Sequence, residues 1–138
     1  MNRSDVQRLA ELRVTDGRVL LSAGNFAGAY YLAGYSVESA LKACIAKRVR
    51  KHDFPDLKTV RDSHQHDLEK LLAVTDLKPK LEKQTKRNRE FEANWAVVKD
   101  WSEQKRYETD ISEKSARDLL TAITDPKHGV LPWLQMFW

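Results

Sequence analysis

The chain has 138 residues, a formal net charge of +4 and a composition of 41% hydrophobic and 32% charged residues. These values are typical of one folded domain, so we expect residues 1–138 to share a single hydrophobic core. One cysteine, Cys44, excludes an internal disulfide, and four scattered histidines argue against a zinc site; we expect no metal or other cofactor. No apolar run approaches the roughly 20 residues that span a bilayer, and the charged N-terminus lacks an apolar signal core, so we expect a cytoplasmic protein that does not enter a membrane.

Hydrophobic spacing predicts a first helix over residues 4–23, with Ser4 as its N-cap. Apolar residues recur at intervals of three to four and form one stripe on this helix: Leu9, Leu12, Val19, Leu20 and Ala23. Gly17 lies inside the helix and weakens it by up to ~1 kcal/mol relative to alanine. Gly24 and Asn25 predict a stop followed by a new N-cap.

A central helix is predicted from Phe26 to about Lys51. Its apolar residues keep helical spacing for five turns, and Gly, Ala and Ser residues lie between them. Small residues let neighbouring helices approach closely, so we expect this helix to be the most buried one. Glu38 and Lys42 fall four residues apart on it. A surface pair of this kind contributes only about 0.2–0.5 kcal/mol, so two charges on so apolar a helix indicate either a buried network or a site.

In the middle of the chain, the sequence predicts a loop followed by two helices. Residues 52–65 include Phe54-Pro55 and show no periodicity, which favours a loop. A short helix is expected from about His66 or Asp67 to Val74, with three leucines facing inward. The next helix is expected to start near Pro79 and to extend to Val98, with an apolar side formed by Leu81, Phe91, Trp95 and Val98.

The C-terminal third contains a cap, a helix and an apolar tail. Residues 100–107 are compatible with a continuation of the preceding helix or with a break. Ser112 predicts the N-cap of a last helix that ends near Thr124. The tail, residues 128–138, is strongly apolar and is expected either to fold back over the helices or to contact another subunit. The expected fold is an all-α, up-and-down bundle of four to five helices with a short extra helix and an apolar C-terminal tail.

The central segment, GNFAGAYYLAGYSVESALKACIAKRV at residues 24–49, resembles the HEPN (higher eukaryotes and prokaryotes nucleotide-binding) domain family. The family pattern leads from a Gly-polar-aromatic start into A-Y-Y-L-A-G-Y-x-V-E-x-x-L-K-A. Three further matches lie at the expected distances: H-D-L-x-x-L-L at 66–72, N-W-x-V-V at 94–98 followed by R-Y at 106–107, and the ending D-P…G-V-L-P-W at 125–133. These matches extend from the first helix to the C-terminus.

The resemblance implies a helical homodimer that acts on RNA or nucleotides, often in defence or toxin–antitoxin settings. Active members of the family are metal-independent endoribonucleases with an R-x(4–6)-H motif, two copies of which meet across the dimer. Arg61 and His66 satisfy this spacing. In ribonuclease members the motif normally lies near the penultimate or final helix, whereas here it precedes the third predicted helix.

Metal-free RNA cleavage needs a proton-transfer group and a cation beside the phosphate. Histidine titrates near neutrality and arginine binds two phosphate oxygens at once, so His66 is the candidate acid or base and Arg61 the candidate phosphate ligand, both catalytic. The alternatives are a helix-start histidine that bonds to backbone and a solvated arginine. Arg106 and Tyr107 are expected to line the groove that holds RNA or nucleotide phosphate, together with Glu38 and Lys42; alternatively, Tyr107 bridges the helices to a carboxylate such as Glu38.

Two basic clusters and two tryptophans extend the candidate binding surface. The clusters are Lys47, Arg48, Arg50 and Lys51, and Lys78, Lys80, Lys83, Lys86, Arg87 and Arg89. Both are either solvated helix faces or contacts for nucleic acid. Trp95 and Trp101 either stack on bases or pack in the core.

The sequence leaves three functions open. The first is a HEPN endoribonuclease, such as a toxin, that uses Arg61 and His66 and places them in a dimer. The second is a non-catalytic module that binds nucleic acid or a nucleotide. The third is a helical dimer whose partner, an antitoxin or a nucleotidyltransferase, carries the chemistry.

Overall fold

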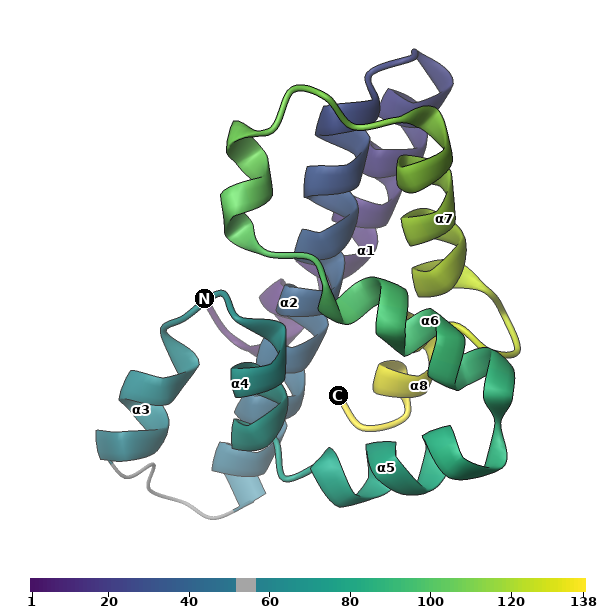
Figure 1. Cartoon of the computed structure of the whole chain (residues 1–138). Coiled ribbons are helices and arrows are strands. Elements are labelled where there is room, and N and C mark those ends of the chain that lie inside the picture. The colour runs from purple at the N-terminus through teal and green to yellow at the C-terminus, as the bar shows by residue number, and fades with distance from the viewer. Residues whose placement is uncertain (52–56) are drawn as a thin grey trace.

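The computed structural model describes residues 1–51 and 57–138, and every regular element in those ranges is helical. In chain order these elements are α1 (Arg3–Ser22), α2 (Phe26–Lys51), α3 (Leu57–Ser63), α4 (Leu68–Val74), α5 (Lys78–Arg87), α6 (Arg89–Lys99), the 3-10 helix η1 (Glu103–Tyr107), α7 (Glu113–Thr124) and α8 (Val130–Gln135) (Figure 1). The all-α class is confirmed, and the described ranges hold more helices than the four to five expected. None of these helices is long and apolar enough to cross a membrane.

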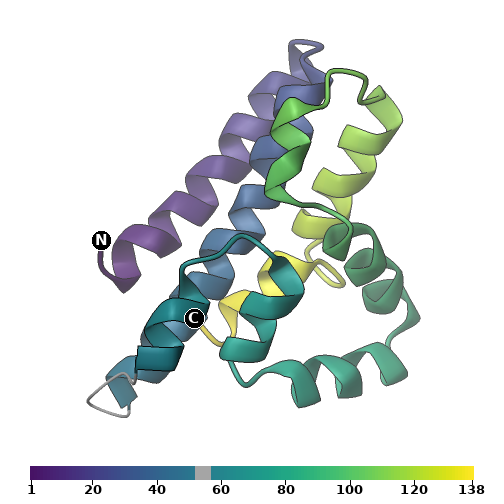
Figure 2. The same cartoon turned by 60° about the vertical axis from the view of Figure 1, so that its left-hand side comes forward.

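The first two helices lie side by side along most of their length (Figures 1 and 2). The N-cap of α1 is Asn2 and not Ser4, because Asn2 and Asp5 exchange two hydrogen bonds between their side chains and backbone N–H groups. The chain then reverses at Gly24, whose φ of 80° places it in the left-handed region. The stop predicted there is confirmed.

The buried face of α1 consists of small residues, and the predicted apolar stripe is wrong in part. Ala10, Val14 and Gly17 are buried, whereas Leu12 and Val19 are largely exposed. An added Cβ at Gly17 would lie 3.4 Å from the carbonyl oxygen of Ala29, which is an ordinary van der Waals contact, so the space between the two helices admits only a small side chain there. Bulky side chains fit better at the margins of so close a contact.

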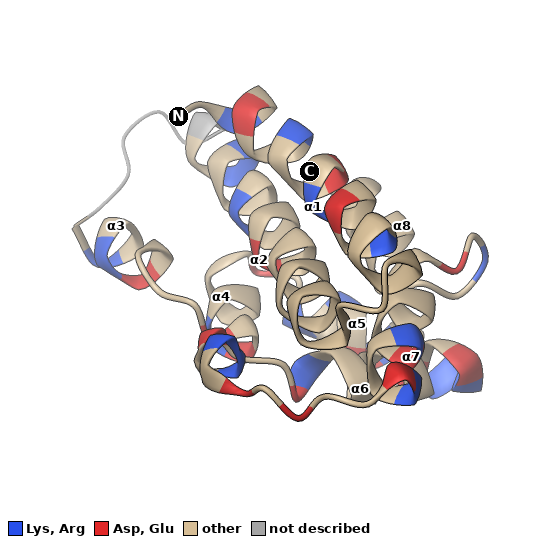
Figure 3. Ribbon diagram, turned by 90° about the horizontal axis from the view of Figure 1, so that it is seen from above, with Lys and Arg blue, Asp and Glu red and all other residues tan. Residues whose placement is uncertain are grey.

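Helix α2 is the centre of the fold, as predicted. Its first half, Phe26–Val37, carries no charged residue (Figure 3), and its buried residues contact α1, α4, α7, α8 and η1. Cys44 is buried in this core, and its thiol donates to the carbonyl oxygen of Leu134. Burial raises the pKa of this thiol to about 12, so it behaves as a small core residue.

The predicted loop over 52–65 is wrong in its second half. Residues 52–56, including Phe54-Pro55, lie outside the described residues, as do the side chains of Arg50 and Lys51 from the first basic cluster. Residues 57–63 form α3, which has no buried side chain. The sequence shows no periodic apolar residues here, because local polar contacts such as the Lys58–Asp62 ion pair stabilise this helix.

The single helix predicted from Pro79 to Val98 is two helices. Asn88 has extended backbone angles, and its side chain accepts a hydrogen bond from the N–H of Phe91 and thereby caps α6. The apolar residues keep their predicted place on both sides of this break, since Leu81, Phe91, Trp95 and Val98 are all buried.

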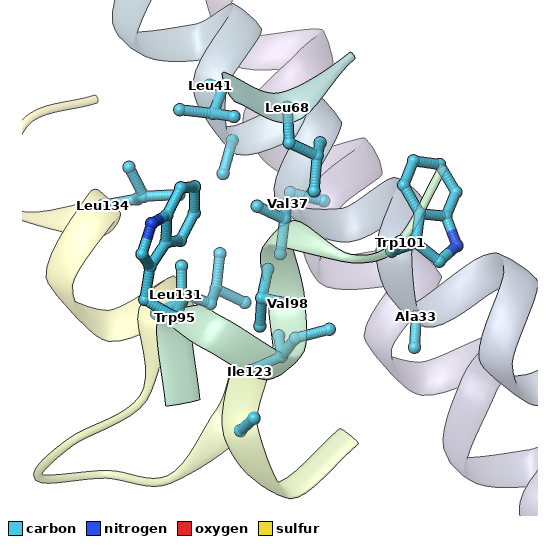
Figure 4. Close-up of a cluster of buried hydrophobic side chains, with 14 of the residues drawn as sticks. Ala33, Val37, Leu41, Leu68, Trp95, Val98, Trp101, Ile123, Leu131 and Leu134 are labelled. Atoms are coloured by element: carbon cyan, nitrogen blue, oxygen red, sulfur yellow. The ribbon is translucent and has the colours of Figure 1, made fainter. Parts of the chain in front are cut away.

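The C-terminal tail folds back over the core and forms α8. Val130, Leu131, Trp133 and Leu134 are buried, whereas Met136 is exposed. Figure 4 shows Leu134 and Trp95 on one side of the buried cluster and Trp101 against α2 on the other. Both Trp95 and Trp101 are buried, so packing and not base stacking describes them.

Candidate functional site

Five of the six residues singled out from the sequence lie in one connected network. The network joins α2, the segment before α4, and η1, which are far apart in the chain. Its members are Glu38, Lys42, His66, Glu103, Arg106 and Tyr107, linked by hydrogen bonds and ion pairs. Glu103 is the member that the sequence analysis missed.

His66 is the centre of this network, because each of its ring nitrogens faces a carboxylate. Nδ1 lies 3.0 and 3.1 Å from the two Glu38 oxygens, and Nε2 lies 2.9 Å from an oxygen of Glu103. Only the imidazolium form can donate from both nitrogens at once. Because both contacts come from the side chains of Glu38 and Glu103, side chains orient the ring. The predicted alternative of a backbone-bonded histidine is wrong.

Glu38 is the buried end of the network. Its side chain is only 4% exposed, and one carboxylate oxygen also accepts a hydrogen bond from Nζ of Lys42 at 2.9 Å. Burying an unpaired carboxylate costs free energy, and the contacts with Lys42 and His66 offset that cost. The i,i+4 spacing in the sequence thus marks a buried network and not a surface pair.

Arg106 and Tyr107 form the exposed end of the network. The Arg106 guanidinium donates to Glu103 at 2.7 Å and to the Tyr107 hydroxyl at 2.7 Å. The guanidinium also lies 4.7 Å from the centroid of the Tyr107 ring. Tyr107 is 68% exposed, so the predicted bridge from its hydroxyl to Glu38 is wrong.

Aromatic side chains form one wall beside His66. The edge of Tyr35 lies against the imidazole, with ring centroids 6.3 Å apart, and Tyr35 also contacts Trp101 at 5.2 Å. Burial, a hydrogen bond with Tyr31 and the nearby Glu38 charge raise the pKa of Tyr35, so it stays neutral in this site. The sequence pattern placed Tyr35 in the family motif but gave no reason to assign it a place beside the histidine.

Trp101 fixes the position of η1 against α2. Its side chain is buried, and its ring lies directly over Gly34, where an added Cβ would lie 2.1 Å from the indole. Glu103 and Arg106 follow within five residues, so this contact sets how the network's carboxylate and guanidinium reach His66. The glycine in the family-like A-G-Y stretch therefore has a structural role.

A hollow of about 300 Å³ opens next to His66. Its lining includes Trp101 and Lys99 together with four carboxylate side chains, those of Asp67, Glu69, Asp100 and Glu103. A phosphate would be repelled from this side, so the cationic approach to His66 lies at Arg106 and Lys42.

Arg61 lies apart from the network. It is exposed in the last turn of α3, and within the described chain its side chain forms no hydrogen bond or ion pair with His66. His64 is also exposed. Arg106 is linked to the histidine through Glu103, which contacts both side chains.

Among the described residues, no group of three or more His, Cys, Asp or Glu side chains is arranged to hold a metal ion. Glu38 and Glu103 lie on opposite ring nitrogens of His66, so the imidazole separates the two carboxylates. No known protein family, curated protein or solved structure matches the chain. The function of the site is therefore argued from its own geometry.

Proposed function

We propose that this chain is a HEPN-like protein that acts on RNA, with the His66 network as its site and a helical bundle of that family as its scaffold. The observation that carries the proposal is the convergence of Glu38, His66 and Arg106, from three separate segments, into one chain of contacts. His66 lies two contacts from the guanidinium of Arg106, through Glu103, and in this proposal the histidine transfers the proton while the arginine binds the phosphate. This pairing is what metal-free cleavage of RNA requires.

In this proposal Glu38 orients the imidazole through Nδ1, and Nε2 exchanges protons with RNA. Nε2 of the neutral imidazole accepts the 2′-OH proton as the 2′-oxygen bonds to phosphorus. The bond from phosphorus to the 5′-oxygen then breaks, and the imidazolium returns the proton to that oxygen. Glu103 occupies Nε2 in this structure. A phosphate that binds Arg106 competes with Glu103 for the same guanidinium, which releases Nε2 for the reaction.

The test is cleavage of a labelled RNA oligonucleotide in the presence of EDTA. We expect 2′,3′-cyclic phosphate products, no cleavage of DNA of the same sequence, and a loss of at least about 100-fold in rate for His66→Ala. Arg106→Ala is expected to impair cleavage strongly. Arg61→Ala tests which of the two arginines cleavage needs, because the sequence motif requires Arg61 and the geometry favours Arg106. Cleavage that survives His66→Ala in a folded protein contradicts the proposal.

A second candidate function is RNA binding without cleavage. It is favoured by the occupation of both ring nitrogens of His66 by carboxylates, which leaves no free nitrogen for proton transfer in this state. It predicts binding that weakens as salt rises, because phosphate contacts release counterions. Arg106→Ala would then lower affinity, while intact RNA is recovered from every reaction.

A further inference from the structure

A second hollow, of about 560 Å³, lies between α5 and the C-terminal segment that follows α7. Its volume falls within the range of roughly 300–1,000 Å³ that is usual for ligand sites. One wall is formed by Lys80, Lys83, Gln84 and Arg87 of α5, and the other by residues from Pro126 to Phe137. It shares no lining residue with the hollow beside His66.

The charged side chains that line this cleft are all cationic. They are Lys80, Lys83, Arg87 and Lys127. Within the described chain none of the four is paired with a carboxylate, and Arg87 donates only to the amide oxygen of Gln84. The cations of α7 differ, since Lys114 and Arg117 each pair with an acidic residue one turn away.

The acidic residue of α5 lies away from the cleft. Glu82 lines a separate hollow on the other side of the helix, together with Trp95 and Lys99. Helix α5 therefore presents an unbalanced positive face to the C-terminal segment. Such a face attracts an anionic partner.

The floor of the cleft is aromatic and apolar. The Phe137 ring packs against Trp133, with centroids 5.0 Å apart, and Trp133 packs against Phe91. Nζ of Lys80 lies 4.9 Å above the Phe137 ring. Met136, next to this ring, is 70% exposed. The cations of α5 thus face partly exposed apolar groups of the C-terminal segment across the cleft.

We propose that this cleft binds single-stranded RNA, with phosphates against Lys80, Lys83 and Lys127 and a base against Phe137 and Met136. Cationic grooves with aromatic side chains suit unpaired strands, because each base exposes a π face only when it is unpaired. A peptide of acidic residues alone, such as polyglutamate, would use the cations but leave the aromatic floor without a matching group. The inference rests on the proposed function, because the cleft would bind a part of the RNA strand that lies outside the His66 network.

The experiment measures binding of a fluorescein-labelled ten-nucleotide oligouridylate by anisotropy at several salt concentrations. The test variant is Lys80→Ala/Lys83→Ala/Lys127→Ala. The matched control is Arg8→Ala/Arg18→Ala/Lys114→Ala, which removes the same charge from exposed positions on α1 and α7. Circular dichroism and thermal unfolding check that both variants remain folded.

We expect the cleft variant to bind at least about tenfold more weakly and to lower the slope of log affinity against log salt by about two, because three phosphate contacts are lost. The control is expected to change affinity less than about twofold, since it removes no phosphate contact. Phe137→Leu keeps an apolar side chain and is expected to weaken binding at least about fivefold without changing the salt slope.

Equal losses in the cleft variant and the control overturn the inference, as does equal affinity for a duplex or for a polyglutamate competitor. Absence of oligouridylate binding by the intact protein also overturns it. The two proposals fail separately. If the cleft variant still binds and cleaves RNA like the intact protein, only the cleft is wrong. If the cleft binds RNA but His66→Ala and Arg106→Ala change neither cleavage nor affinity, only the function proposed for the His66 network is wrong.

Discussion

The position of Trp101 depends on the absence of a side chain at Gly34. We predict that Gly34→Ala destabilises the protein by about 1–3 kcal/mol, because its Cβ would lie 2.1 Å from the buried indole and force that ring out of place. Gly28→Ala is the matched control on the same helix. There the nearest atom is the end of the flexible Leu20 side chain at 3.3 Å, and alanine favours the helix by up to ~1 kcal/mol.

Urea unfolding followed by tryptophan fluorescence measures both changes. If Gly34→Ala is as stable as Gly28→Ala, the contact between Trp101 and α2 is not as close as described. Loss of RNA activity in Gly34→Ala at a temperature where it remains folded would show that η1 needs this contact to place Arg106 and Glu103.

Glu38 is the residue on which the network's stability depends. We predict that Glu38→Ala lowers the free energy of unfolding by about 2 kcal/mol, because it leaves Lys42 and His66 without their shared acceptor and opens a small cavity. Lys42 and His66 remain partly hydrated, so the loss stays below that of a fully buried pair. Glu113→Ala removes the exposed ion pair with Arg117 and is expected to cost less than ~0.5 kcal/mol. A similar loss in both variants would contradict the central place of Glu38.

At the scale of elements, one carboxylate contributes to the hydrogen bonds that stabilise the turn between α7 and α8. Asp125 accepts hydrogen bonds from the backbone N–H groups of Lys127 at 2.9 Å and His128 at 2.8 Å. These bonds lower the pKa of Asp125 below its ordinary value of 3.8. The turn therefore gains stability from Asp125 above pH 3.8, and that gain is lost as the pH falls through the lower pKa of the folded state.

We predict that Asp125→Asn flattens the loss of stability between about pH 4 and pH 2, since an amide oxygen can accept the same bonds without titrating. Asp125→Ala is expected to be less stable than either at neutral pH. Urea unfolding at a series of pH values measures the difference. An unchanged acid profile in Asp125→Asn would show that other carboxylates account for the acid sensitivity.

Elements with a periodic apolar face and a capping residue were predictable from the sequence. Ser112 caps α7, and Asp67 caps α4, close to the expected positions. Helix α3 was missed because it buries nothing, and the break at Asn88 was missed because the apolar spacing continues across it. Periodicity reports which residues are buried, and it carries no signal for a helix that rests on local polar contacts alone.

At the scale of the whole molecule, the candidate site combines residues that the sequence could name with contacts that it could not. Glu38, His66 and Arg106 were named from a family-like pattern, but their convergence depends on how η1 packs against α2. Glu103 stood three residues before Arg106, and this i,i+3 spacing was the available signal for it. The separation of Arg61 from His66 could not be foreseen, because their spacing in the chain says nothing about the direction of their side chains.

Truncation of the C-terminal tail tests whether a single chain forms the whole hydrophobic core. A chain that ends after His128 lacks Val130, Leu131, Trp133 and Leu134, which are buried against the core. Removing one large buried side chain costs about 2–5 kcal/mol, and the total stability of a domain is only about 5–15 kcal/mol. We therefore predict that this truncation prevents cooperative folding and exposes the apolar surface of α2 and α6.

A chain that ends after Gln135 is the control, because it keeps all four buried residues and removes the exposed Met136 with two partly exposed aromatic residues. This shorter loss is expected to leave a folded protein with a lower melting temperature. Circular dichroism and size-exclusion chromatography distinguish the outcomes. If the chain ending after His128 remains a folded monomer, the tail is a contact between subunits and not a part of the core. Loss of folding in that chain alone means that α8 completes the hydrophobic core of each subunit, whatever further contacts the exposed end of the tail makes.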